Sequence, residues 1–194
     1  MAKKLSRDDI MDMDAYGKVR KERRRAITAM KKDRRLGVGP DATSYFENFE
    51  TMRHQIHEML FVEKGGEAQI EDELTAYAPM VPNGRELVMT LMFEVDDPNR
   101  RAALLSGLGG VEETLSITVG DDVIKGVAED DIDRTTADGK ASAIQFLHFP
   151  FTDEQVSGFK DLSNKVVIGI DHEKYGHMAI MPQAMRNALA ADFD

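Results

Sequence analysis

The chain has 194 residues, of which 42% are hydrophobic and 31% are charged, and this composition is typical of a folded globular protein of one compact unit. It contains no cysteine, which excludes disulfides, thiolate nucleophiles and iron–sulfur clusters held by cysteine. No apolar run approaches the roughly 18 residues that span a bilayer, and no apolar segment follows the lysines of residues 1–7, so we expect a cytoplasmic protein without membrane contact.

The charge is divided unevenly along the chain. The formal net charge is −10, but residues 1–35 contain 13 lysines and arginines against 6 acidic residues, whereas residues 36–194 contain 12 against 29. A basic arm near +7 therefore precedes an acidic body near −17. Such an arm can dock on its own body, on another acidic protein or on phosphates, and charge alone does not choose between these partners.

The first 80 residues are predicted to be mainly helical. Helices are expected over residues 6–16, 18–35, 50–63 and 67–77, with a short strand over 43–46 between the second and the third. Ser6 followed by acidic residues predicts the first helix N-terminus, and apolar residues recur at helical spacing in the later segments. Glycines or prolines follow the last three helices and end them.

Residues 81–194 are predicted to contain two diverged strand–helix–strand–strand units and a last helix from Pro182 to about Ala191. The first unit (86–128) has strands over 87–95, 114–119 and 123–128 and a helix over 98–105. The second (142–181) has strands over 144–149, 166–170 and 177–181 and a helix over 152–162, after a polar linker over 130–140. We therefore predict an α+β fold in which an N-terminal helical region (1–80) packs with one mixed or antiparallel sheet built from two βαββ units.

Five segments carry a family resemblance. They are SYFENFETMRHQIHEML, ELTAYAPMVPNG, LLSGLGGVEETLSITVG, AIQFLHFPF and VVIGIDHEKYGHMAIMP. In this order and spacing the chain resembles, over nearly its whole length, the uncharacterised bacterial family DUF3501. The resemblance implies no catalytic residue. Members are encoded beside rubrerythrin-like proteins and heterodisulfide-reductase-type iron–sulfur proteins, so the resemblance implies a redox or peroxide-stress setting and partners of these two kinds.

The first candidate site is the group Glu50, His54, His57 and Glu58. Spacings of three and four residues bring side chains on a helix within reach of one metal ion. Imidazole and carboxylate ligands suit Zn²⁺, Mn²⁺ or Fe²⁺. The order is not HExxH, which excludes the zinc-peptidase helix. The alternative is a solvated polar helix face.

The second candidate site is the group Asp171, His172, Tyr175 and His177, at a strand end, its turn and the returning strand. Residues on opposed hairpin strands lie close together, so Asp171, His172 and His177 are candidate ligands of a two-histidine, one-carboxylate metal site, or members of a proton-transfer group. The alternative is that His172 and Tyr175 bond their own turn while His177 lies on a sheet face. His148 is expected on the opposite sheet face in a structural role.

An arginine cluster is the third feature of the sequence. It comprises Arg20, Arg23, Arg24, Arg25, Arg34 and Arg35. Such a cluster attracts phosphates, but only Tyr16 is near enough to stack on a base, so a solvated or protein-docking face is favoured over nucleic-acid binding.

Three hypotheses of different class remain, and whether the protein is an enzyme stays open. The favoured one is an accessory or scaffold protein that acts beside rubrerythrin-like and iron–sulfur proteins. The second is a small metal-dependent enzyme that uses His172, His177 and a carboxylate. The third is nucleic-acid binding through residues 1–35. No dinucleotide-binding, Walker A, EF-hand or GxSxG motif occurs.

Overall fold

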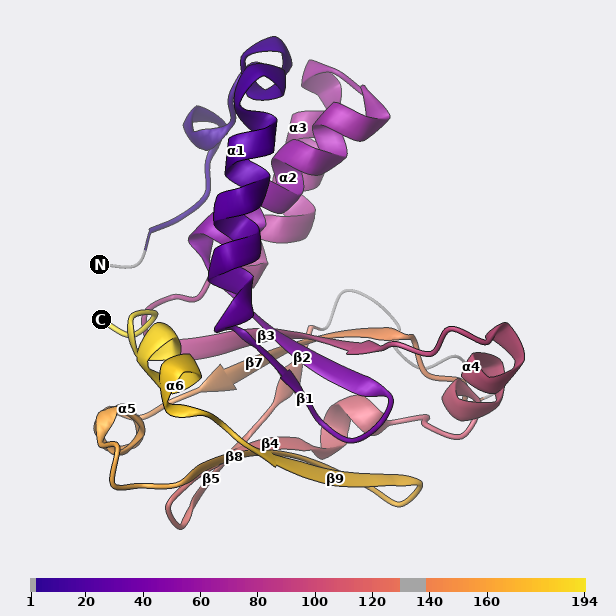
Figure 1. Cartoon of the computed structure of the whole chain (residues 1–194), viewed down its shortest axis with the longest axis vertical. Coiled ribbons are helices and arrows are strands. Elements are labelled where there is room, and N and C mark those ends of the chain that lie inside the picture. The colour runs from indigo at the N-terminus through magenta and orange to yellow at the C-terminus, as the bar shows by residue number, and fades with distance from the viewer. Residues whose placement is uncertain (1–2, 130–138) are drawn as a thin grey trace.

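The computed structural model describes residues 3–129 and 139–194 and consists of a group of three helices beside two packed sheets (Figure 1). The helices are α1 (Met13–Lys32), α2 (Phe49–Glu63), α3 (Glu67–Tyr77), α4 (Pro98–Leu105), α5 (Asp153–Lys160) and α6 (Gln183–Ala190). Short 3-10 helices add Arg7–Asp9, Ala78–Met80 and Val111–Thr114. The expected α+β class is confirmed. Within the described residues, none of the helices combines the length and the apolar character needed to cross a membrane.

The strands form two antiparallel sheets. They are β1 (Arg35–Gly37), β2 (Ala42–Glu47), β3 (Glu86–Phe93), β4 (Leu115–Val119), β5 (Asp122–Lys125), β6 (Val127–Ala128), β7 (Ile144–Pro150), β8 (Val166–His172) and β9 (Tyr175–Ile180). The first sheet has the order β1-β2-β3-β7-β6, and the second has the order β5-β4-β8-β9. Strands β1 and β2, from the mainly helical first 80 residues, thus belong to the first sheet.

The two predicted units do not share one sheet as expected. Each unit contributes its first strand to the first sheet and its next two strands to the second, so that β3 pairs with β7 and β4 pairs with β8. The alternation of side chains explains this division. One face of β3 buries Leu87, Met89 and Leu91, and this apolar face needs a cover. The second sheet supplies that cover with residues such as Ile117 and Ile168, in the same buried cluster.

The strand predicted over 123–128 is divided at Gly126. Its first part pairs with β4 as β5, and its last two residues pair with β7 as β6. A Cβ atom at residue 126 would lie 3.0 Å from Leu147 and 3.1 Å from Phe149, so a larger residue would press on both buried side chains where the chain passes between the sheets. Most of the linker predicted over 130–140 lies outside the described residues.

The helices predicted over 6–16 and 18–35 are replaced by a 3-10 turn and one long helix. Ser6 caps the turn, but the helix starts only at Met13, because the Asp12 carboxylate accepts hydrogen bonds from the backbone N–H groups of Asp14 and Ala15. Gly17 does not interrupt α1. The prediction was wrong here because one well-capped helix start outweighs one glycine inside a 20-residue helix.

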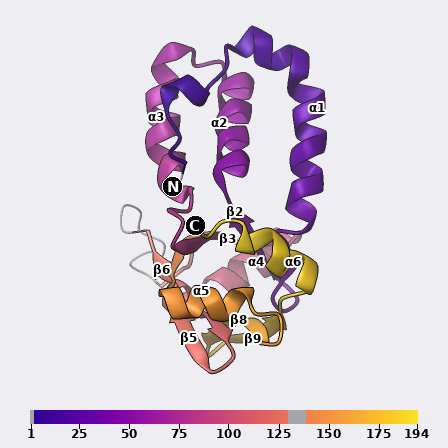
Figure 2. The same ribbon diagram turned by 90° about the vertical axis from the view of Figure 1, so that its left-hand side faces the viewer.

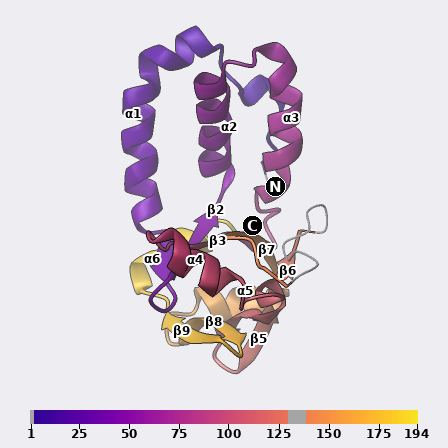
Figure 3. The same ribbon diagram turned by 90° about the vertical axis from the view of Figure 1, so that its right-hand side faces the viewer.

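Helices α1, α2 and α3 stand side by side with α2 in the middle (Figures 2 and 3). A second core joins α2 and α3 to the N-terminal segment and to the outer face of β3. It consists of Leu5, Ile10, Met52, Ile56, Leu60, Ile70, Met80 and Val88. Helix α1 takes little part in this core, and it buries only Tyr16 and Ile27 along its length.

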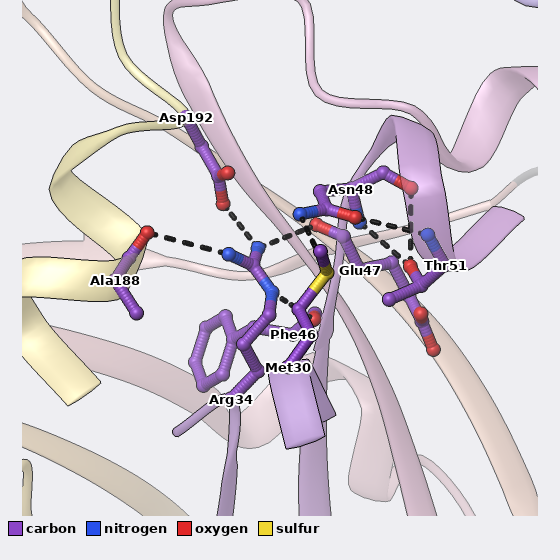
Figure 4. A network of polar contacts seen from close by, with 8 residues as sticks. All are labelled: Met30, Arg34, Phe46, Glu47, Asn48, Thr51, Ala188 and Asp192. Carbon is purple, nitrogen blue, oxygen red and sulfur yellow. Dashed lines mark hydrogen bonds and ion pairs between the residues drawn. The ribbon is translucent and has the colours of Figure 1, made fainter. Parts of the chain in front are cut away.

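Buried Arg34 anchors the C-terminal end of α1 to the sheets (Figure 4). Its guanidinium donates hydrogen bonds to the carbonyls of Phe46 at 2.9 Å, Glu47 at 3.0 Å and Ala188 at 3.3 Å, and it forms an ion pair with Asp192. Arg34 was expected in the surface arginine cluster. That expectation was wrong, because the side chain turns inward at the end of α1 to satisfy carbonyls of β2 and α6.

Candidate functional site

One flank of α1 forms a basic groove of about 830 Å³. Its cationic lining side chains are Arg20, Lys21, Arg24, Arg25, Lys32 and Arg35. Phe61 of α2 also lines it, and a Cβ atom at Gly17 would lie 3.1 Å from the Phe61 ring, so the glycine lets this ring approach α1. No carboxylate contributes to the lining among the residues that the structure describes. The groove therefore attracts anions.

A polar network joins α1 to α2 through Arg20, which also lines this groove. The Arg20 guanidinium binds the Glu58 carboxylate through two hydrogen bonds of 2.9 and 2.8 Å. The Tyr16 hydroxyl donates to the same carboxylate at 2.7 Å. These hydrogen bonds, with Arg20 as the largest cause, lower the pKa of Glu58 to about 2. Burial, followed by the hydrogen bond to Glu58, raises the pKa of Tyr16, so the phenol stays protonated and remains a donor.

His57 is buried beneath this network and is held as a neutral imidazole. Its Nε2 accepts a hydrogen bond of 3.0 Å from the backbone N–H of Met11, so Nδ1 carries the proton and donates to the Arg53 carbonyl at 2.6 Å. The ring stacks on Tyr16 with centroids 4.7 Å apart. Burial lowers the pKa of His57, which agrees with the neutral form. His57 thus fixes the N-terminal segment to α2.

The first candidate metal group is not brought together around one point. His57 uses both ring nitrogens for backbone groups, Glu50 pairs with Arg53, and Glu58 is held by Arg20 and Tyr16. Of these four residues, only His54 keeps a ring nitrogen without a partner in the described structure: its Nδ1 lies 3.3 Å from the Tyr16 hydroxyl, and its Nε2 has no hydrogen bond. In residues 3–129 and 139–194, no three histidine or carboxylate side chains are grouped so that they could hold a metal ion.

The second candidate group is divided between two faces of the second sheet. His172 and Tyr175 lie on the inner side, whereas Asp171 is exposed on the other face because neighbouring residues of β8 alternate. The His172 ring bonds the Gly109 carbonyl at 3.3 Å and accepts from the Lys174 N–H at 3.2 Å.

Tyr175 ties this strand to the loop between β1 and β2. Its hydroxyl donates to the Val38 carbonyl at 3.0 Å and accepts from the Asp41 N–H at 2.9 Å. The His177 ring packs edge-on against Tyr175, with centroids 4.5 Å apart. Gly39, at φ +79°, lies under this pair, and a Cβ atom there would be 2.5 Å from the His177 ring. His172, Tyr175 and His177 therefore pack and hydrogen-bond around loops.

His148 lies on the outer face of the first sheet between two carboxylates. Its Nδ1 is 3.0 Å from Glu86 and its Nε2 is 2.6 Å from Glu129. Two carboxylate partners require both ring nitrogens to donate, which is the protonated form. The hydrogen bond to Glu86 is the largest cause that raises the pKa of His148, and the hydrogen bond to Glu129 adds to it.

Comparison with known proteins places the chain in a family. The family described as "Protein of unknown function (DUF3501)" matches residues 4–193. The chain belongs to the DUF3501 family. It is also similar to a protein of unknown function from Burkholderia pseudomallei, whose crystal structure was determined at 1.90 Å resolution. The two share 35% sequence identity over 99% of this chain and 100% of the other, with a TM-score of 0.91. No curated protein matches the chain.

Several contacts of the α1–α2 region in this DUF3501 protein were not predicted from the sequence. Tyr16 and Arg20 are one helical turn apart on α1, which is a visible spacing, but their convergence on Glu58 joins residues about 40 positions apart. The sequence carries no signal for the contact of Met11 with His57. Arg23, expected in the arginine cluster, lines a second groove on the opposite flank of α1.

Proposed function

We propose that this DUF3501 protein is a cytoplasmic accessory protein that binds an acidic surface of a rubrerythrin-like or iron–sulfur protein. The observation that carries the proposal is the basic groove of α1, where six cationic side chains converge and no carboxylate lines the described wall. The family resemblance supplies the class of partner and its redox or peroxide-stress setting. In this function the protein acts through its surface and not through chemistry of its own.

The groove has the length of a protein-docking surface. It follows α1 from Gly17 to Lys32, which is about 22 Å at 1.5 Å per residue. A partner helix of about four turns with carboxylates at i and i+4 spans the same length and faces the same row of cations. Electrostatic complementarity of this kind speeds association and selects the partner's orientation.

An acidic protein fits the molecule better than a long nucleic acid. Residues 36–194 carry a formal charge near −17, so a duplex that extends beyond the groove is repelled by the rest of the protein. The one aromatic ring of the described lining, Phe61, is covered by the Arg20 guanidinium at 4.7 Å and is not free to stack on a base. A protein partner can present its carboxylates to the groove alone.

Charge reversal in the groove tests the proposal. The double variant Lys21→Glu/Arg25→Glu changes two exposed groove residues, and we expect it to weaken binding of a purified rubrerythrin-like protein from the same organism by about tenfold or more. Biolayer interferometry at low and high salt measures the effect, and wild-type binding should weaken as salt rises.

Lys18→Glu is the matched control. It reverses one charge, half the change of the double variant, at an exposed position of the same helix outside the groove lining, and we expect less than a threefold effect. The proposal is wrong if neither a rubrerythrin-like nor an iron–sulfur protein binds, or if the double variant binds as the wild type does. Tighter binding to duplex DNA than to either protein would instead favour the nucleic-acid function.

A further inference from the structure

A second groove, of about 510 Å³, lies on the flank of α1 opposite the basic groove. Its two walls differ in character. Helix α1 supplies apolar surface from Val19, Ala26 and Met30 with Glu22 and Arg23 beside it, while α2 supplies mainly polar side chains, namely Glu50, Arg53, His54 and His57. A volume of this size is in the range of small-molecule sites, which combine an apolar lining with a few placed polar groups.

The polar network between α1 and α2 ends at this groove. Glu58 is ionised and accepts the single proton of the Tyr16 hydroxyl at 2.7 Å. The 3.3 Å contact between the Tyr16 hydroxyl and His54 Nδ1 then leaves the hydroxyl oxygen as the acceptor, so Nδ1 carries the imidazole proton. The remaining nitrogen, Nε2 of His54, holds a lone pair.

His54 Nε2 is open to a ligand. No hydrogen-bond partner for it occurs among residues 3–129 and 139–194, and it is not one of the buried atoms that lack a partner, so it is accessible to solvent. Burial lowers the pKa of His54, which agrees with a neutral ring. The groove therefore presents a neutral hydrogen-bond acceptor, His54 Nε2, beside an apolar wall, in addition to the carboxylates of Glu22 and Glu50.

We propose that this groove binds a small aromatic molecule that carries a hydroxyl group, with the O–H donating to His54 Nε2. The thioethers of Met11 and Met30 line the groove and make favourable contacts with aromatic rings. The small side chain of Ala26 leaves room for a flat ring against α1. The Arg23 guanidinium lines the same groove and can donate to the ligand oxygen, because no ion-pair partner of Arg23 is found in the described chain.

A matched pair of ligands tests the hydrogen bond. Isothermal titration calorimetry on the full chain compares 2-naphthol with 2-methoxynaphthalene, which has the same rings but no O–H donor. We expect 2-naphthol to bind about tenfold more tightly, as one satisfied hydrogen bond predicts. The variant His54→Leu should remove this preference and leave both ligands at the weaker affinity.

A matched pair of substitutions tests the location. Ala26 and Ala29 are both exposed on α1, but Ala26 lines this groove and Ala29 lines the basic groove. Ala26→Trp should fill the site and lower 2-naphthol affinity more than tenfold, whereas Ala29→Trp should retain it. Circular dichroism melting verifies that both variants fold, and neither variant changes His54.

Any one of three results would overturn the inference. These are no binding of 2-naphthol to the wild type, equal binding of the methoxy analogue, and an equal loss of affinity in both tryptophan variants. A failure of this inference would leave the proposed function unaffected. The acidic partner is tested with charge reversals in the basic groove, and these residues lie on the other flank of α1.

Discussion

The two-sheet part and the three-helix part of the molecule differ in what fills the space between their elements. Between the sheets, aliphatic and aromatic side chains from Val38 to Phe193 form one continuous buried cluster. Between α1 and α2, a polar network of Tyr16, His54, Glu58 and Arg20 makes much of the contact, and a groove lies on each flank of α1. The sheets therefore hold the molecule together, while the α1–α2 pair carries the two grooves for which we propose a partner and a ligand.

Truncation of one phenylalanine in each part should give the largest difference. Phe149 is fully buried between the sheets, and we expect Phe149→Ala to lower the free energy of unfolding by ~4 kcal/mol. Phe61 is half-buried at the basic groove, and Phe61→Ala should cost only ~1 kcal/mol. Urea denaturation followed by circular dichroism measures both. Equal losses would contradict the distinction between a packed sheet core and an open helical part.

The joint between the two parts should give the next largest effect. Asp192→Asn removes the charge that pairs with buried Arg34, and we expect a loss of ~3 kcal/mol because the guanidinium stays buried without a counter-ion. Asp153→Asn is the matched control, since Asp153 pairs with Arg85 on the surface, and it should change stability by less than ~1 kcal/mol. Urea unfolding midpoints report both. A small effect of Asp192→Asn would mean that α1 does not need this anchor.

The pH dependence of stability should give the smallest effect, at the outer face of the first sheet. Because the hydrogen bonds to Glu86 and Glu129 raise the pKa of His148 in the folded state, its contribution is fully present below its ordinary pKa of 6.5. The contribution is lost as the pH rises through the higher folded-state pKa. We expect ~1 kcal/mol less stability above that pKa from this group. Urea unfolding of the wild type across this pH range, compared with His148→Gln, measures the loss. The variant should lack this part of the pH dependence, and a parallel curve would refute the assignment.

Local sequence patterns predicted many elements well. The helix predicted over 50–63 is α2 (Phe49–Glu63), and the helix predicted over 67–77 is α3 (Glu67–Tyr77). Here apolar spacing and terminal signals agree, so the local preference and the packed structure favour the same conformation. The division into helices over 6–16 and 18–35 was wrong, because one helix capped by Asp12 runs through Gly17.

The candidate sites were less predictable. His54 and Glu58 were identified from their spacing on one helix, but their chemistry depends on Tyr16 and Arg20 of another helix. His172 and His177 were identified as potential ligands, yet their contacts lie with Gly109 and Tyr175 and with the loop at Gly39. Spacing shows which side chains share a helix or a hairpin, but not which backbone groups reach them from elsewhere.

Composition, charge division and periodicity were enough to predict the α+β class, the order of strands and helices in residues 81–194 and the concentration of positive charge near the N-terminus, because each of these depends on residues close together in the chain. The division of the strands into two sheets, the inward turn of Arg34 and the two grooves on α1 depend on contacts between distant residues. Such contacts form only in the folded chain, where apolar faces pack against other elements and buried polar groups form hydrogen bonds.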